Sequence, residues 1–273
     1  MQKIDYQDKW AYIVGGSQGI GFAIATEFLK RKSNVLLIAR NAEKLNKAVT
    51  QLQDQFSTAH IRILVADASD ETLLKQSFER LSTQEKIRPY FLINCAGGAR
   101  PHYFEDITTE QLNETFRQNI VSAWSAVKVA LPYLKKTGGY IINTSSLAGI
   151  LGVFGYTDYS MTKFGLIGFS EALRSELERY NIKVSVLCPP DTSTPGFEIE
   201  NQTKPPETIA VSKNAKLMTA EQVAKNTLKQ FEKGKFLLLV NLESKFIELA
   251  KRLIPNIAYK IMQIDVRKAQ KKL

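Results

Sequence analysis

The stretch Trp10–Gly21, WAYIVGGSQGIG, decides the fold of this chain. Five apolar, strand-forming residues are followed by glycines at positions 15, 19 and 21, in a GxxxGxG pattern. Glycines at this spacing between a strand and a helix let the backbone approach a pyrophosphate, and the helix N-terminus offers it free N–H groups. The stretch therefore predicts a nucleotide-binding turn. The predicted contacts are Gly15, Ser17, Gln18, Gly19, Ile20 and Gly21.

Outward from this turn, short apolar runs alternate with longer segments of helical periodicity. The expected strands are Trp10–Val14, Asn34–Ala39, Ile61–Ala66, Tyr90–Asn94, Tyr140–Thr144, Lys183–Leu187 and Phe236–Val240. The expected helices include Gly21–Lys32, Ala42–Phe56, Thr109–Lys136 and Asp158–Tyr180. Runs that are apolar throughout indicate strands buried on both faces of a parallel sheet. The sequence thus predicts an α/β, doubly wound Rossmann fold with a seven-stranded parallel sheet between two helical layers. Residues 1–241 are expected to form one domain, and residues 242–273 an amphipathic helical tail.

The composition excludes several classes of protein. A chain of 273 residues with 44% apolar and 23% charged residues fits a soluble globular protein with a full core. Cys95 and Cys188 lie in apolar runs, so we expect them to be buried and reduced. With only His60 and His102, and no CxxC, neither a metal site nor a Ser–His–Asp hydrolase is predicted.

The end of the second expected strand indicates which dinucleotide binds. An NAD site places an acidic residue there for the ribose 2′-hydroxyl, but this chain has Arg40, with Lys44 one turn into the next helix. Because a guanidinium fork suits a 2′-phosphate, the sequence predicts NADP(H). The alternative is that both cations are solvated residues at the start of a helix. Asp67, after the third strand, is placed either for the adenine or in the N-cap region of the next helix.

The segment YSMTK places Tyr159 and Lys163 four residues apart, and thus on one face of a helix. An ammonium at that distance is expected to lower the pKa of the phenol toward the working range of an acid–base catalyst. Ser146 ends the INTSS strand, from which its hydroxyl can reach a carbonyl oxygen beside the tyrosine. Asn119 lies within an expected helix, where its amide can hold a water that relays protons to Lys163.

Together with NCAG at positions 94–97, these residues resemble the short-chain dehydrogenase/reductase family across residues 8–235. The resemblance implies a catalytic tetrad of Asn119, Ser146, Tyr159 and Lys163. Tyr159 would protonate the carbonyl oxygen as hydride leaves the nicotinamide, and Lys163 would also bind the nicotinamide ribose. Further cofactor contacts are expected at Asn94, Ala96, Gly97, Pro189, Thr192 and Thr194. The chain departs from the family pattern at Val14, Cys95 and Pro190, where Thr, Asn and Gly are usual.

The longest irregular stretch, about residues 189–216, holds five of the nine prolines and follows the end of a strand. Such a connection is typical of a lid over a binding site, the alternative being a solvated loop without a role. Residues 188–197, 200–205 and 207–208, with GGSQGIG at 15–21, ARNAEKL at 39–45 and FGYTDYSMTKF at 154–164, resemble the 3-ketodihydrosphingosine reductases within the family. That resemblance implies NADPH-dependent reduction of the 3-keto group of a long-chain sphingoid base to dihydrosphingosine, in sphingolipid synthesis.

Two other functions remain open on the sequence. One is a 3-oxoacyl-thioester reductase or a steroid- or retinol-type dehydrogenase of the same family. The other is a non-catalytic NADP(H)-sensing protein, against which the complete set of four catalytic residues argues.

The net charge of +10 is concentrated at the C-terminal end, where the residues from Lys233 onward carry +7. Leu242, Phe246, Leu249 and Leu253 form one helical stripe, and Arg267, Lys268, Lys271 and Lys272 follow. A basic amphipathic helix predicts peripheral membrane binding; the alternative is packing on the domain itself or on a partner subunit. No nucleic-acid-binding signature, signal peptide or transmembrane run is found, so we expect a cytoplasmic protein at the cytoplasmic membrane face that does not bind nucleic acid. We also expect a homo-oligomer, a dimer or tetramer.

Overall fold

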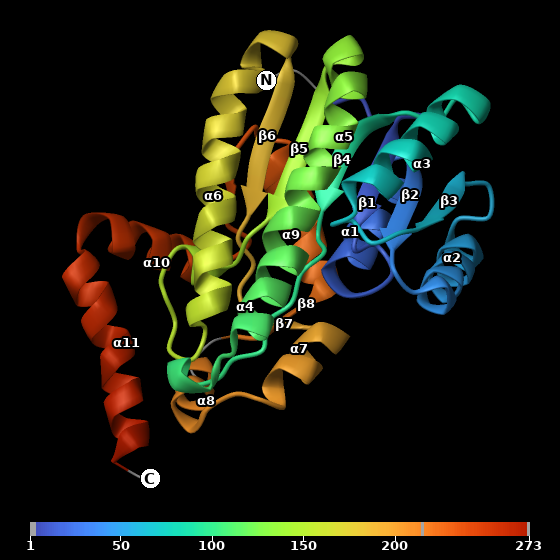
Figure 1. The fold of residues 1–273 in the computed structure, drawn as a ribbon. Coiled ribbons are helices and arrows are strands. Elements are labelled where there is room, and N and C mark those ends of the chain that lie inside the picture. Colours follow the sequence, from blue (N-terminus) through green and yellow to red (C-terminus); the bar gives the residue numbers. More distant parts are fainter. Residues whose placement is uncertain (1–3, 214–215, 272–273) are drawn as a thin grey trace.

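The computed structural model describes residues 4–213 and 216–271. Asn214 and Ala215 of the expected lid and Lys272 of the basic end lie outside the described residues. Seven parallel strands form the main sheet in the order β3-β2-β1-β4-β5-β6-β9. Their bounds are β1 Trp10–Val14, β2 Asn34–Ala39, β3 Ile61–Val65, β4 Pro89–Asn94, β5 Gly139–Thr144, β6 Ile182–Leu187 and β9 Leu237–Leu238. The predicted doubly wound fold is confirmed, with a last strand shorter than expected (Figure 1).

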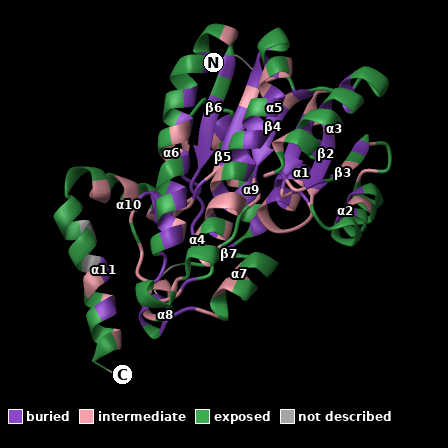
Figure 2. Ribbon diagram, in the orientation of Figure 1, coloured by how far each residue is buried: buried purple, intermediate pink, exposed green. Residues whose placement is uncertain are grey.

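Helices cover both faces of this sheet, which explains why the strands are apolar throughout. On β1, Ala11 and Ile13 pack into one layer, whereas Tyr12 and Val14 pack into the other. The first layer holds α1 Gly19–Lys30, α2 Ala42–Gln55 and α9 Ala220–Phe231. The second holds α3 Glu71–Gln84, α5 Ser122–Thr137 and α6 Thr157–Leu177. The buried residues accordingly lie along the strands and the inner faces of these helices (Figure 2).

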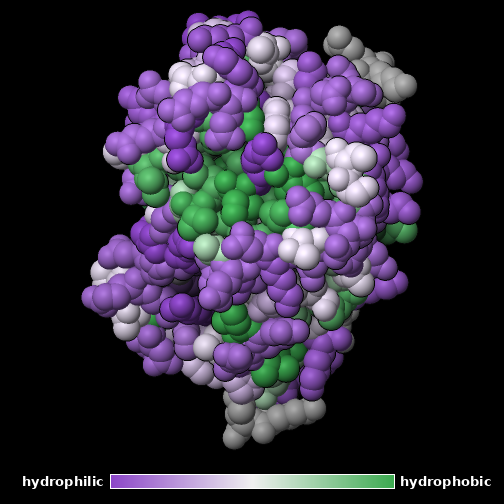
Figure 3. Space-filling model, turned by 90° about the vertical axis from the view of Figure 1, so that its right-hand side faces the viewer, coloured by the Kyte–Doolittle hydropathy of each residue, from purple (hydrophilic) through white to green (hydrophobic). Residues whose placement is uncertain are grey.

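The right-hand side of Figure 1, where β3 and α2 lie, faces the viewer in Figure 3. Apolar side chains gather near the middle of that view, and hydrophilic side chains surround them.

The helix expected at Thr109–Lys136 is interrupted. The structure has α4 Thr109–Phe116, a π-helical turn η2 Arg117–Val121, and then α5. Such turns often mark functional positions, and this one holds Asn119. The Asn119 amide donates to the Gly98 carbonyl oxygen at 3.0 Å and its oxygen accepts from the Gly98 N–H at 3.0 Å. These two bonds join the turn to the loop after β4.

The expected lid contains short regular elements, because proline favours the first turn of a helix. Pro195 and Pro206 each lie in the first turn of a helix, α7 Pro195–Asn201 and α8 Pro206–Ser212. A small sheet pairs β7 Thr192–Ser193 with β8 Met218–Thr219. Short 3-10 turns complete the chain at η1 Phe104–Asp106, η3 Leu147–Gly149 and η4 Glu178–Tyr180.

The tail forms two helices, α10 Leu242–Leu253 and α11 Pro255–Gln270. Met262 and Val266 are buried where α11 packs against α8. The apolar stripe of α10 stays open to solvent: Leu242 is 81% exposed and Leu253 67%. The alternative of packing on the domain therefore holds for one face of α11, whereas the stripe of α10 is not covered (Figure 2). Membrane binding by the tail stays a prediction. Across the described residues, no helix has the length and apolar character needed to span a membrane.

Candidate active site

A cavity of about 650 Å³ opens at the carboxyl ends of the strands, where the strand order reverses between β1 and β4. It extends from the glycine turn to the tail helices. Seventeen of the predicted site residues line it: Gly15, Ser17, Gln18, Gly19, Ile20, Gly21, Arg40, Lys44, Asp67, Ala96, Gly97, Ser146, Tyr159, Lys163, Pro189, Thr192 and Thr194. Asn94 and Asn119 are absent from this lining.

The glycine turn presents backbone donors to one end of the cavity. Gly15 has φ +79°, and a Cβ there would lie 2.6 Å from the Ala96 nitrogen, so only glycine fits between β1 and the segment after β4. Gln18, the N-cap of α1, makes no side-chain capping bond, and the first turn of α1 has no acidic residue. The free N–H groups and the helix dipole therefore favour an anion at this point.

Arg40 and Lys44 line the same end of the cavity, beyond β2. The Arg40 side chain is 56% exposed, with Nη1 4.0 Å from the Asp67 carboxylate and 3.9 Å from the Glu114 carboxylate. It is thus oriented near the cavity while remaining accessible to a ligand.

Asp67 lines the cavity but is not the N-cap of the following helix, because Asp70 caps α3. The Asp67 carboxylate accepts hydrogen bonds from Ser69 and Arg117. Burial opposes its ionisation, but these hydrogen bonds outweigh burial and hold the pKa of Asp67 at about 2. Asp67 is therefore a fixed anion on the cavity wall.

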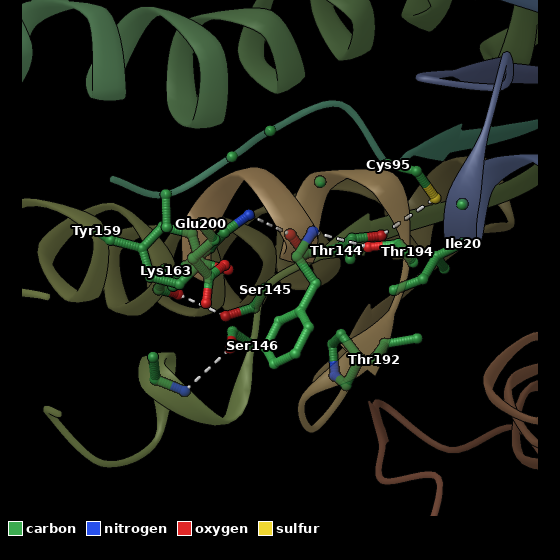
Figure 4. A pocket seen from close by; sticks show the side chains of 18 of the residues that line it. Ile20, Cys95, Thr144, Ser145, Ser146, Tyr159, Lys163, Thr192, Thr194 and Glu200 are labelled. Atoms are coloured by element: carbon green, nitrogen blue, oxygen red, sulfur yellow. Dashed lines mark hydrogen bonds between the residues drawn. The ribbon is translucent and has the colours of Figure 1, made fainter. Parts of the chain in front are cut away.

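Three predicted catalytic side chains meet at the middle of the cavity (Figure 4). Tyr159 and Lys163 both extend from α6, and the Lys163 Nζ lies 5.4 Å from the centre of the Tyr159 ring. The Lys163 ammonium donates to the Thr144 carbonyl oxygen at 2.9 Å. Ser146, just after β5, lies close enough to the Tyr159 phenol to favour its ionised form, and the Ser146 hydroxyl oxygen accepts from the Ala148 N–H at 3.1 Å.

The protonation states differ from the sequence prediction. Burial, followed by the negative charge of Glu200, raises the pKa of Tyr159, although Ser146 acts in the opposite direction. The expected lowering of this pKa is therefore wrong for this structure, because desolvation of the phenolate dominates. Burial lowers the pKa of Lys163 to about 8. At neutral pH the site thus holds a protonated phenol and a mostly charged ammonium, the pairing that proton donation needs.

Asn94 and Asn119 hold the surrounding backbone instead of facing the cavity. The Asn94 amide donates to the Asn143 side-chain oxygen at 2.7 Å, which joins β4 to β5. A Cβ at Gly97 would lie 2.3 Å from the Asn119 Oδ1 and 3.3 Å from the Lys163 Nζ. Asn119 and Lys163 therefore both border Gly97, and Asn119 sits behind the loop that forms the cavity wall.

Cys95 and Cys188 are free thiols, Cys188 buried and Cys95 partly so. The Cys95 Sγ lies 3.3 Å from the Thr144 hydroxyl, and burial raises the pKa of Cys95 to about 11. Neither thiol is therefore ionised at neutral pH.

The sequence reasoning missed two parts of the lining. Glu200 on α7 lines the cavity beside Tyr159, and no motif or spacing in the sequence distinguishes it from the other acidic residues of the lid. The tail also contributes, through Phe246, Ile247, Ala250 and Met262. Its amphipathic pattern was visible in the sequence, but the pattern cannot tell which surface the apolar face meets.

Comparison with known proteins agrees with this geometry. The sequence model described as short chain dehydrogenase matches residues 9–205. The chain is 37% identical to the 3-ketodihydrosphingosine reductase of Bos taurus over 234 residues, which are 82% of this chain and 68% of the relative. It is 33% identical to the 3-ketodihydrosphingosine reductase of Dictyostelium discoideum over 253 residues, 87% of this chain and 76% of the relative. Among solved structures, YwfH, an NADPH dependent reductase involved in bacilysin biosynthesis, superposes with a TM-score of 0.72 at 27% identity, covering 83% of this chain and 91% of YwfH.

Proposed function

The chain belongs to the short chain dehydrogenase family, and we propose that it uses NADPH to reduce the 3-keto group of 3-ketodihydrosphingosine to dihydrosphingosine. One observation carries this proposal: a single cavity joins a dinucleotide-type turn, a protonated phenol and an apolar end. The similarity to 3-ketodihydrosphingosine reductases supports the choice of substrate. A non-catalytic sensor has no need of a protonated phenol held next to a hydroxyl and an ammonium.

The residues present fit NADP(H). The uncapped N-terminus of α1 would hold the pyrophosphate, Arg40 and Lys44 the 2′-phosphate, and Lys163 the nicotinamide ribose. Asp67 would accept a hydrogen bond from the adenine. The rest of the cofactor would be bordered by Gly97, Pro189, Thr192 and Thr194. Bound NADPH supplies the hydride that the carbonyl carbon receives.

The catalytic steps assigned to this chain are proton movements. Tyr159 gives its phenolic proton to the keto oxygen, which balances the hydride and yields the alcohol. The Ser146 hydroxyl lies near the phenol and is placed to hold the keto oxygen beside it. The Lys163 ammonium favours the phenolate that forms, and Asn119 fixes the Gly97–Gly98 loop next to that ammonium.

The apolar end of the cavity suits a long hydrocarbon chain. It is formed by the turn after β5, the lid and the tail, and includes Leu147, Leu151, Val153, Val211, Phe246, Ile247 and Met262. A saturated chain gains about 0.8 kcal/mol per buried CH₂ group, so binding there would be strong without any polar contact.

We also propose that residues 1–241 form the catalytic domain and that residues 242–273 place it at a membrane. The exposed stripe of α10 includes Phe246, which also lines the cavity. A long-chain keto lipid resides in the membrane, so a cavity that ends at an interfacial helix gives it a short route to the site. The proposed enzyme is cytoplasmic, peripheral on the cytoplasmic membrane face, and a homo-oligomer that does not bind nucleic acid.

The experiment is a kinetic panel on the purified full-length chain. Consumption of NADPH and NADH is followed with 3-ketodihydrosphingosine, a 3-oxoacyl thioester and a steroid ketone. We expect 3-ketodihydrosphingosine to be the preferred substrate and NADPH to be favoured at least about tenfold. Arg40→Ser should remove most of the cofactor preference and leave turnover with NADH unchanged. Equal rates on all three ketones, or no turnover at all, would rule out the proposed function.

A further inference from the structure

Glu200 is a carboxylate in the cavity wall that the proton transfer does not use. It extends from α7, and its side chain is 17% exposed. The Tyr156 hydroxyl donates to the Glu200 Oε1, and the Tyr156 ring lies 5.7 Å from the Tyr159 ring. The carboxylate is therefore one side chain away from the phenol at which the ketone is reduced (Figure 4).

The two oxygens of this carboxylate have different surroundings. Oε1 accepts from Tyr156 and also lies 3.3 Å from the Lys204 Nζ. Throughout residues 4–213 and 216–271, no group donates a hydrogen bond to Oε2. Glu200 lines the cavity, and Oε2 is not among the polar atoms that are fully buried without a partner. Oε2 is thus available to a donor that enters the cavity.

The neighbouring charges favour a cationic donor. The Lys204 side chain is only 2% exposed and its ammonium lies 4.1 Å from the centre of the Phe197 ring, so it is closed off from the cavity behind Glu200. Asp191 also lines the cavity, and its charge acts on both Glu200 and Tyr159. Lys163, the other nearby cation, is engaged at the Thr144 carbonyl oxygen. Two carboxylates therefore border the place where a ketone meets Tyr159.

We infer that Glu200 binds the ammonium group of an α-amino ketone through Oε2, and so selects substrates that carry a cation next to the reacting carbonyl. In such a substrate the nitrogen is attached to the carbon beside the carbonyl, so a keto oxygen held by Tyr159 brings the ammonium to this wall. Neither a 3-oxoacyl thioester nor a steroid ketone has a cation at that place. The inference rests on the proposed function, because 3-ketodihydrosphingosine is an α-amino ketone.

The test compares two substrates in the full-length enzyme with NADPH: 3-ketodihydrosphingosine, and the same hydroxy ketone with hydrogen in place of the amino group. We expect wild type to prefer the amino ketone in kcat/KM by about tenfold or more, as a charge-assisted hydrogen bond provides. In Glu200→Gln this preference should fall to about twofold or less. Glu198→Gln, an exposed change on the same helix, should behave as wild type.

A second variant separates binding from folding, because Glu200→Gln leaves the Lys204 ammonium buried without its partner. Glu200→Gln/Lys204→Met removes both charges together and should show the same loss of preference. A wild-type enzyme without preference, a Glu200→Gln variant that loses both activities equally, or a Glu198→Gln variant that also loses the preference would overturn the inference while the proposed function stands. An enzyme that reduces neither ketone would overturn both.

Discussion

Replacing Tyr159 by phenylalanine removes one oxygen from the centre of the cavity. The ring that lies 5.7 Å from Tyr156 is kept, as is the α6 backbone that carries Lys163. The phenol is protonated at neutral pH because burial raises its pKa, so the variant loses the group that donates the proton. Positioned proton transfer contributes about 10²–10⁴-fold, which corresponds to about 2.7–5.4 kcal/mol in the activation free energy.

The assay measures kcat from NADPH consumption with 3-ketodihydrosphingosine, the NADPH Kd from nucleotide fluorescence, and the thermal midpoint of unfolding. We expect kcat to fall by at least 10²-fold while Kd changes by less than about threefold, because the glycine turn and Arg40 are untouched. Tyr12→Phe is the matched control: it removes a buried hydroxyl that donates to the Ile87 carbonyl at 3.2 Å, so it should cost about 1–3 kcal/mol of stability and no activity. A Tyr159→Phe variant that kept more than about a tenth of wild-type kcat would refute the assignment of the acid.

Three further outcomes follow from the structure. The pKa of Lys163 is about 8, so its ammonium is charged below that pH and loses its proton above it. We therefore expect kcat/KM for ketone reduction to decline as pH rises through about 8. A flat profile to pH 10 would contradict the role of the Lys163 ammonium in favouring the phenolate. Gly97→Ala should destabilise the fold by about 1–3 kcal/mol in chemical denaturation, because its Cβ would lie 2.3 Å from the Asn119 Oδ1. The control Gly168→Ala on α6 has open space around it and should be neutral or stabilising. Equal stabilities of the two variants would be inconsistent with the Asn119 contact. Leu242→Glu should weaken flotation with anionic liposomes about tenfold or more, since Leu242 is 81% exposed on the stripe of α10. The control Leu73→Glu, at an exposed leucine on α3, should float as wild type does. Wild-type flotation by the Leu242 variant would argue against the interfacial helix.

The local signals of the sequence were sufficient for the architecture. The run before Gly15 and the glycine spacing after it define a strand, a turn and a helix from neighbouring residues alone. Apolar runs of five or six residues mark the strands of a sheet buried on both sides, since each face of β1 packs into its own helical layer. Tyr159 and Lys163 share a helix, so their proximity follows from the helical repeat and needs no tertiary contact.

Distances between segments that are remote in the sequence were decided by the tertiary structure. The pKa of Tyr159 depends on desolvation and on Glu200, 41 positions away, so a neighbouring lysine gave the wrong direction. Asn119 contacts Gly98 from a π-helical turn, which is invisible in the pattern of apolar residues.

The tail shows the same division. Its amphipathic pattern came from the sequence, but only the packing of α11 on α8 brings Met262 into the cavity wall and leaves Leu242 in solvent. A pattern of apolar residues records how much surface must be covered, whereas what covers it depends on where the rest of the chain lies. The sequence by itself therefore determined the sheet, the glycine turn and the Tyr159–Lys163 pair. The tertiary structure decided the protonation of that pair, the place of Glu200, and which part of the tail closes the cavity.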